Sequence, residues 1–155
     1  MKQVIWKYES LDQLRQVLTK KKVVLVGGCF DLIHYGHFTF LTKAQTLGDE
    51  VVIALESDEH IARYKKRQPV HTQLERATIL SGLRFVDRVL LLPFFKTDAE
   101  YGQMVVKLDP DIIAVSHPDR QLSHKKEHAE LVGATVIEVT EVLPQFATRR
   151  IVESP

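Results

Sequence analysis

The sequence predicts a doubly wound α/β fold, with a mainly parallel five-stranded sheet and helices on both faces. Short apolar runs of strand length alternate along the chain with stretches whose apolar residues recur at helical spacing. Strands that alternate with helices in this way are typical of parallel sheets covered on both faces. The expected strands are residues 23–26, 50–55, 86–92, 111–115 and 134–140.

The helices expected between these strands begin and end at residues typical of helix termini. Ser10 precedes the first helix, and Gly48, Gly82 and Gly133 lie at or near the ends of three others. Residues 1–22 are expected to form an extended N-terminal arm followed by a lead-in helix. The expected helices are residues 11–18, 35–47, 58–64, 72–83, 98–108, 120–132 and a short closing helix at 148–153.

Length and composition predict an ordinary globular protein, with residues 1–155 forming one undivided domain. The 21 basic and 20 acidic residues leave a net charge of +1, which favours neither nucleic acid nor a membrane as partner. The single cysteine, Cys29, excludes an intramolecular disulfide and fits a reducing compartment. Because the sequence shows neither an apolar signal core nor a run long enough to span a membrane, we expect a cytoplasmic protein.

The stretch from residue 23 to residue 37 carries the strongest functional signal. Four apolar residues lead to Gly27-Gly28 and then to His34-x-Gly-His37 at the expected start of a helix. Unpaired backbone N–H groups, the positive end of the helix dipole and two imidazoles at one place favour an anionic ligand. The phosphate-binding patterns G-x-G-x-x-G and G-x-x-x-x-G-K-[ST] are absent here. A zinc site is less favoured, because no third ligand stands at a typical spacing.

Residues 28–37, Gly-Cys-Phe-Asp-Leu-Ile-His-Tyr-Gly-His, resemble the signature of the cytidylyltransferase-like nucleotidyltransferases. The resemblance runs from about Ser10 to Val152 and includes residues 47–49, 57–58, 75–76, 84–87 and 110–113. It implies a Rossmann-like fold and transfer of a nucleoside monophosphate from CTP or ATP to a small phosphorylated alcohol or sugar. Pyrophosphate would leave as the acceptor phosphate attacks the α-phosphorus in line. The resemblance also implies Mg²⁺ held by the triphosphate rather than by side chains, and a homodimer.

The resemblance assigns a role to each matching residue. His34, His37 and Lys66 would be catalytic, and Asp31 and Arg76 would bind the acceptor, although Arg76 could equally pair with an acidic residue. The nucleotide-binding residues would be Gly28, Cys29, Phe30, Gly36, Lys65, Arg67, His117, Asp119, Thr148 and Arg149. For Asp119, a helix-capping role is an equal alternative.

The C-terminal half departs from the family pattern. Ser116-His117-Pro118-Asp119 stands where relatives have Gly-Asp, and residues 147–150, Ala-Thr-Arg-Arg, replace a motif like Ser-Thr-Thr. Only Thr148 keeps a hydroxyl, and Arg149 could supply charge in its place. Residues 84–89, Arg-Phe-Val-Asp-Arg-Val, put a glycerol-3-phosphate cytidylyltransferase-like activity first. The alternatives are a heptose-phosphate-type or FMN adenylyltransferase, and a catalytically weakened nucleotide-binding regulatory domain.

Overall fold

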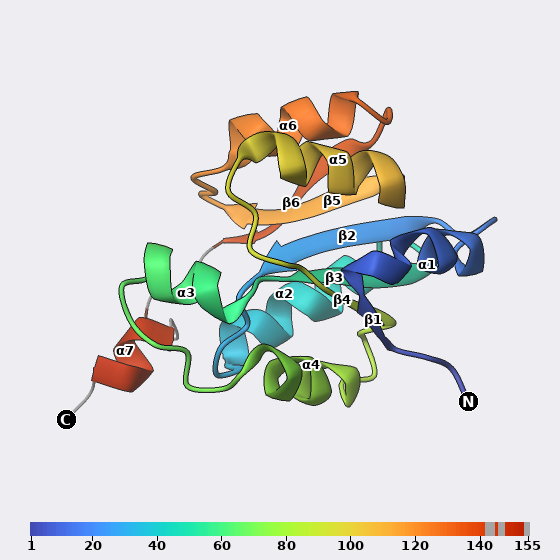
Figure 1. The fold of residues 1–155 in the computed structure, drawn as a ribbon. Coiled ribbons are helices and arrows are strands. Elements are labelled where there is room, and N and C mark those ends of the chain that lie inside the picture. The colour runs from blue at the N-terminus through green and yellow to red at the C-terminus, as the bar shows by residue number, and fades with distance from the viewer. Residues whose placement is uncertain (142–144, 146–147, 154–155) are drawn as a thin grey trace.

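In the computed structural model, which describes residues 1–141, 145 and 148–153, a six-stranded sheet forms the centre of the molecule (Figure 1). The strand order is β1-β4-β3-β2-β5-β6, and every neighbouring pair is parallel. The strands are β1 (Ile5–Lys7), β2 (Val23–Gly28), β3 (Glu50–Leu55), β4 (Arg88–Leu91), β5 (Ile112–His117) and β6 (Thr135–Glu141).

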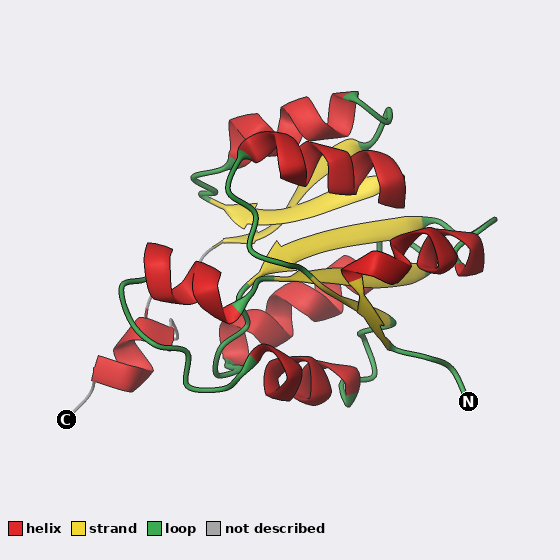
Figure 2. Cartoon of the chain, viewed as in Figure 1, coloured by secondary structure: helices red, strands yellow, loops and turns green. Residues whose placement is uncertain are grey.

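Helices cover both faces of this sheet, as Figures 1 and 2 show. The helices α1, α5 and α6 pack into the hydrophobic core on one face, and α2 and α4 pack into the core on the other. The short helices α3 and α7 lie toward the end where the strands finish. The helices are η1 (Tyr8–Ser10), α1 (Leu11–Val17), α2 (Tyr35–Gln45), α3 (Asp58–Tyr64), α4 (Gln73–Ser81), α5 (Asp98–Leu108), α6 (Leu122–Glu130) and α7 (Thr148–Glu153).

The continuous apolar runs are explained by burial on both faces of the sheet. Every residue of β3 is buried. Because successive side chains of a strand point to opposite faces, Val52 and Ala54 enter one core while Val51 and Ile53 enter the other. The doubly wound α/β fold predicted from the sequence is therefore confirmed.

The sixth strand corrects the expected number of five. Residues 5–7 form β1, which pairs with β4 so that Ile5 lies opposite Val89, whereas we expected an extended arm and counted no strand there. Trp6 is buried in the core and donates its indole N–H to the carbonyl of Gln3 at 3.1 Å. A three-residue strand is too short to show a periodic pattern, and its partner lies more than 80 residues away in the sequence.

The other boundaries differ from expectation by a few residues. The strand expected at 86–92 is shorter, because Val86 closes a turn with the carbonyl of Leu83 and the Asp87 carboxylate accepts the Val51 N–H at 2.9 Å. The strand expected at 111–115 instead covers Ile112–His117. The Asp111 carboxylate just before it accepts the Val23 N–H at 2.7 Å.

The strand order places a topological switch point at the carboxyl end of β2. From β2 the chain moves outward through β3 to β4, then returns to place β5 on the opposite side of β2. The loop that follows β2 and the loop that follows β5 lead away in opposite directions. Such loops leave a crevice between them at this end of the sheet, which is where ligands bind in open α/β sheets. The residues that carry the sequence signature occupy this end.

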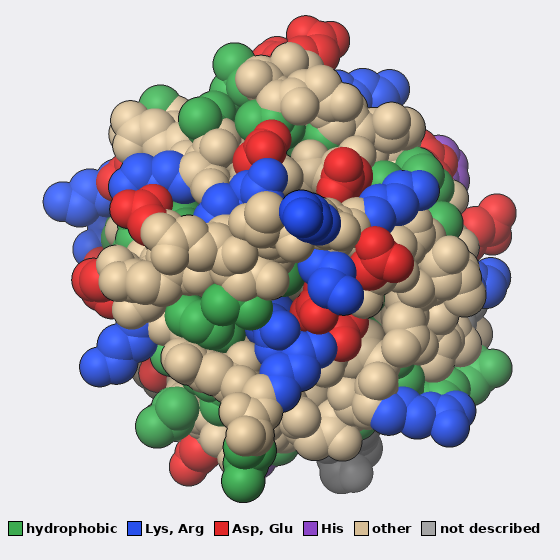
Figure 3. Space-filling view, turned by 90° about the vertical axis from the view of Figure 1, so that its right-hand side faces the viewer, with side chains coloured by type: hydrophobic (Ala, Val, Ile, Leu, Met, Phe, Trp, Pro, Cys, Tyr) green, Lys and Arg blue, Asp and Glu red, His purple; other side chains and the backbone are tan. Residues whose placement is uncertain are grey.

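The opposite end of the sheet, where the strands begin, has a mixed charge. Figure 3 shows this side of the molecule, on which basic and acidic side chains lie beside one another. Lys2 pairs with Glu50 at 3.2 Å and with Asp87 at 3.0 Å, and Arg15 pairs with Asp109 at 2.8 Å. Balanced ion pairs of this kind are typical of a solvated surface. Within the described part of the chain, no helix has the length and apolar character needed to cross a membrane.

Candidate active site

The loop between β2 and α2 folds tightly back on the strand that precedes it. A Cβ atom on Gly28 would lie 2.8 Å from Cε2 of Phe30, so only glycine admits the buried aromatic ring at this point. Phe30 and Leu32 have φ angles of 47° and 60°, a left-handed conformation that is costly for residues with a side chain. Such strain persists only where surrounding contacts enforce it.

His34 and His37 form a reciprocal capping arrangement at the start of α2. Nδ1 of His34 lies 3.1 Å from the backbone nitrogen of Gly36 and 3.4 Å from that of His37. In return, Nδ1 of His37 lies 3.4 Å from the backbone nitrogen of His34. The two rings stack with their centroids 3.7 Å apart. Because both Nδ1 atoms accept hydrogen bonds, each neutral ring carries its proton on Nε2, the nitrogen that can donate to a ligand.

Burial keeps both imidazoles uncharged. Desolvation lowers the pKa of His37 to about 3, and the neighbouring His34 acts in the same direction. Desolvation also lowers the pKa of His34. At neutral pH the pair therefore offers two N–H donors rather than two positive charges. Neutral donors held in place by the backbone can stabilise charge on an anion without first losing a solvent shell.

Asp31 anchors the loop of residues 67–71 to the signature loop. Its carboxylate accepts hydrogen bonds from the Arg67 guanidinium at 2.7 Å, the Val70 N–H at 3.0 Å and the His71 N–H at 3.1 Å. Burial acts to raise its pKa, but the hydrogen bonds from Val70, Arg67 and His71 outweigh burial and lower the pKa below its ordinary value. Asp31 is 2% exposed, so the structure places it between two loops, with both oxygens already bonded to protein. Its expected contact with an acceptor stays a prediction.

The three basic residues at 65–67 lie in two different environments. Arg67 is held by Asp31 and by the carbonyl of Gln68 at 3.0 Å. Lys65 and Lys66 are exposed at the end of α3, and Lys66 has a left-handed φ of 53°. The charge of Lys65 acts on Cys29, whose thiol pKa is raised by burial and lowered again in part by that charge. A lysine ammonium therefore lies within electrostatic reach of the signature loop.

Arg76 joins three segments around the site. Its guanidinium is fully buried and donates to the carbonyl of Cys29 at 2.5 Å, to the Asp58 carboxylate at 2.8 Å and to the carbonyl of His71 at 3.1 Å. Of the two roles left open for Arg76, the structure shows the pairing with an acidic residue. This arginine holds the signature loop, the start of α3 and the 67–71 loop in one arrangement.

Of the C-terminal residues expected at the site, Thr148 contacts the signature loop. The Thr148 hydroxyl, at the start of α7, donates to the carbonyl of Asp31 at 2.6 Å, which brings α7 against the signature loop. Arg149 belongs to α7. The side chain of Arg149, and Ala147 as a whole, lie outside the described residues.

His117 and Asp119 follow β5, on the other side of the crevice. Nδ1 of His117 lies 2.9 Å from a carboxylate oxygen of Glu138 on β6. Asp119 accepts the Gln121 N–H at 2.7 Å and pairs with Lys125 at 2.5 Å, so it caps the turn that leads into α6. The structure does not place either residue in contact with the histidine pair, and their nucleotide contacts stay predictions.

Glu56 is a buried acid that the sequence interpretation missed. It follows β3 directly, and its backbone N–H donates to the carbonyl of Gly28 at 3.0 Å. The Tyr101 hydroxyl donates to Oε1 of Glu56 at 2.9 Å, and Nδ1 of His60 lies 3.3 Å from Oε2. Burial raises the pKa of Glu56 to about 7. The sequence does contain a signal for this residue, because Glu56 is an acidic residue directly after the apolar run at residues 51–55.

The chain belongs to the cytidylyltransferase-like family, whose model matches residues 25–151. It is 39% identical over 124 residues to an FAD synthase from Thermococcus kodakarensis, covering 77% of this chain and 80% of that protein. It is 40% identical over 111 residues to the bifunctional protein HldE from Campylobacter concisus, covering 69% of this chain and 23% of that protein. A solved structure of a lipopolysaccharide core biosynthesis protein from Thermoplasma volcanium superimposes with a TM-score of 0.62 and 26% identity, covering 79% of this chain and 97% of that one.

These relatives differ in how much of their length the chain represents. It spans about a quarter of the HldE proteins, 23% and 26% in two Campylobacter species. It spans 80% and 72% of two Thermococcus FAD synthases. The family membership confirms the nucleotidyltransferase class that residues 28–37 indicated.

The anchoring role of Asp31 predicts a loss of stability in Asp31→Asn. The amide would set an NH₂ group against donors that now face a carboxylate, and the free energy of unfolding should fall by about 1–3 kcal/mol. Urea denaturation measures this change. Asp49→Asn is the matched control, because exposed Asp49 accepts a single backbone N–H from Lys22 at 2.8 Å. Equal losses in the two variants would contradict the anchoring role.

The raised pKa of Glu56 predicts a pH-dependent effect of Glu56→Gln. The folded protein holds a proton on Glu56 between its ordinary pKa of 4.5 and about 7, so this contribution to stability is complete below pH 4.5 and is lost as pH rises through 7. The unfolding free energy of the wild type, relative to that of the variant, should therefore fall from pH 5 to pH 8. Urea denaturation at several pH values measures the trend.

Two further variants control for other titrations. Glu100→Gln replaces an exposed acid whose pKa is lowered by hydrogen bonds from Thr97, so its effect should stay constant from pH 5 to pH 8. The Glu56 comparison is repeated in a His60→Gln background, because His60 lies beside Glu56 and its own pKa is lowered by burial. A flat difference in both backgrounds would show that Glu56 is ionised throughout this range.

Proposed function

We propose that the chain is an adenylyltransferase, which transfers AMP from ATP to the phosphate of a small phosphorylated acceptor and releases pyrophosphate. The observation that carries this proposal is the His34–His37 pair, which holds two neutral Nε2–H donors at the switch point of the sheet. Adenylyl transfer is favoured over cytidylyl transfer by the relatives named FAD synthase, since FAD contains an adenylyl group joined to the phosphate of FMN.

The reaction needs positioning and charge stabilisation rather than a covalent intermediate. An oxygen of the acceptor phosphate attacks the α-phosphorus of ATP, a new P–O bond forms, and the bond to the bridging oxygen of pyrophosphate breaks. The Nε2–H groups of His34 and His37 would donate to phosphate oxygens on which charge grows. Lys66, with Lys65 beside it, would neutralise the leaving pyrophosphate from the other side of the loop.

Mg²⁺ would enter with the triphosphate. The described carboxylates that follow β2 and β3 are already engaged: Asp31 with Arg67, Glu56 with Tyr101, and Asp58 with Arg76. Mg²⁺ is commonly bound through substrate phosphates and waters with only one or two protein carboxylates. These donor groups therefore fit a metal carried by ATP better than a metal held by side chains, and Mg²⁺ would draw charge from the phosphate oxygens.

The acceptor is assigned by a direct assay of pyrophosphate release. ATP and CTP are each tested with FMN, a heptose 1-phosphate and glycerol 3-phosphate as acceptors. Release with ATP and either of the first two acceptors supports the proposal. Release with CTP and glycerol 3-phosphate would overturn it in favour of the activity that residues 84–89 favour. Nucleotide binding without release from any acceptor would favour a regulatory domain.

The proposed enzyme is a homodimer. The expectation comes from the resemblance to the family, in which homodimers are common. Sedimentation velocity of the purified chain measures the mass in solution, and a purely monomeric species would contradict this part of the proposal.

His37→Ala should lower turnover by at least ~100-fold, because the variant loses one donor to the transition state. The substitution also removes the acceptor for the His34 N–H, so circular dichroism and a thermal midpoint are measured to show that the variant is folded. His71→Ala is the control, because only the backbone of His71 bonds to Asp31. Near-wild-type turnover in a folded His37→Ala protein would exclude His37 from the site.

Lys66→Ala should weaken ATP binding and slow turnover, because an exposed cation at the end of α3 is removed. Lys20→Ala is a closely matched control, since Lys20 is also an exposed lysine with a left-handed φ, 65° against 53° for Lys66. Any change common to both variants reflects the backbone conformation and not the phosphate contact. Isothermal titration with ATP and steady-state kinetics separate the two effects. An effect confined to Lys65→Ala would move the assignment by one residue.

A further inference from the structure

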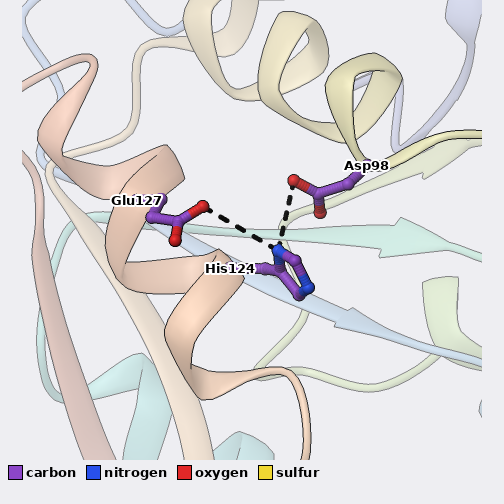
Figure 4. A group of neighbouring side chains, drawn as sticks. All are labelled: Asp98, His124 and Glu127. Carbon is purple, nitrogen blue, oxygen red and sulfur yellow. Dashed lines mark ion pairs between the residues drawn. The ribbon is translucent and has the colours of Figure 1, made fainter.

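We propose a binding site for a divalent transition-metal ion of the zinc type between α5 and α6, outside the nucleotide site. Its donors are His124 and Glu127 on α6 and Asp98 in the first turn of α5. Figure 4 shows the imidazole of His124 between the two carboxylates. The three donor atoms all lie within 4.8 Å of one another.

The distance between His124 and Asp98 matches the spacing of ligands around such an ion, and the Glu127 oxygen lies somewhat farther away. Zinc binds imidazole nitrogen and carboxylate oxygen at about 2.0–2.2 Å, so neighbouring donors of a tetrahedral site lie about 3.3–3.6 Å apart. Nδ1 of His124 lies 3.3 Å from Oδ2 of Asp98 and 3.9 Å from Oε2 of Glu127. The Glu127 side chain is 70% exposed, so neighbouring atoms leave it room to rotate toward the other two donors. A water molecule would complete the coordination.

His128 holds one of the proposed ligands, Asp98, in position. It lies one turn after His124, on the face of α6 that packs against α5, and is 8% exposed. Its Nε2 lies 2.9 Å from Oδ2 of Asp98, the same oxygen that faces His124. A metal-bound carboxylate held by a neighbouring N–H group is a common supporting arrangement in metal sites.

The donor set selects the kind of metal. Two carboxylates balance a double positive charge, and an imidazole nitrogen favours zinc, copper, nickel or cobalt over magnesium and calcium, which prefer oxygen alone. Bound metal would tie α6 to α5 beside the groove lined by Gly102, Val106 and Leu131. The site would therefore stabilise the packing of these two helices, and its existence does not depend on the proposed transfer reaction.

The test uses the full chain freed of metal with a chelator. Isothermal titration with ZnCl₂ at pH 7.5 should show binding that is lost in His124→Ala and in Asp98→Asn. Zinc should raise the thermal midpoint of the wild type and leave that of His124→Ala unchanged, since a ligand stabilises only the form that binds it. With Co²⁺ in place of zinc, the visible absorption of the bound ion reports tetrahedral coordination.

Matched variants separate the site from other histidines. His71→Ala, which removes a histidine paired with Glu75 at 3.9 Å, should bind zinc as the wild type does. His128→Gln keeps an N–H donor and should retain binding, whereas His128→Leu should weaken it about 10-fold. Zinc binding that persists in His124→Ala and disappears in His37→Ala would overturn the proposal in favour of the nucleotide site. The absence of binding to the wild type would leave the cluster as surface ion pairs and would also overturn it.

Discussion

The site depends on one constraint: the signature loop takes a costly backbone path, and its polar groups must be satisfied by segments from elsewhere in the chain. Phe30 and Leu32 are left-handed, which places the intervening Asp31 inside the protein. Its carboxylate is satisfied by the 67–71 loop and its carbonyl by Thr148. The carbonyl of Cys29 is satisfied by Arg76. Three separate segments therefore hold the loop that positions the histidine pair. The same hydrogen bonds fix the positions of these segments.

This arrangement explains how much of the molecule could be predicted from the sequence. The buried strands and the start of α2 have strong local signals, because apolar runs and the His-x-Gly-His spacing are visible within a few residues. The pairing of β1 with β4 and the bond between Arg67 and Asp31 join residues far apart in the sequence. Local patterns contain no information on such contacts. Arg67 illustrates the limit, since it belongs to the basic run with Lys65 and Lys66, yet its guanidinium bonds to Asp31 and fixes the loop itself.

The charge of the site follows from burial as much as from residue type. Histidines expected to contact a triphosphate suggest positive charge, yet burial lowers the pKa of His37 to about 3. The positive charge near the signature loop belongs instead to exposed lysines at the end of α3, of which Lys65 acts on Cys29. In the proposed function, the histidines would act as neutral donors fixed by their Nδ1 hydrogen bonds, and the lysines of another element would supply the charge that phosphates need.

We expect substrate choice to depend on the parts of the crevice that surround this shared centre. The signature loop, Arg76 and the 67–71 loop form one bonded unit, so changes there would disturb the geometry common to the reaction class. The opposite wall, after β5, has contacts of its own: the His117 side chain pairs with Glu138 on β6, and Asp119 caps the turn that leads into α6. These residues, together with residues 147–150, are where the sequence departs from the family pattern. We therefore expect the choice of nucleobase and acceptor to depend on this wall, while the histidine pair stays in place.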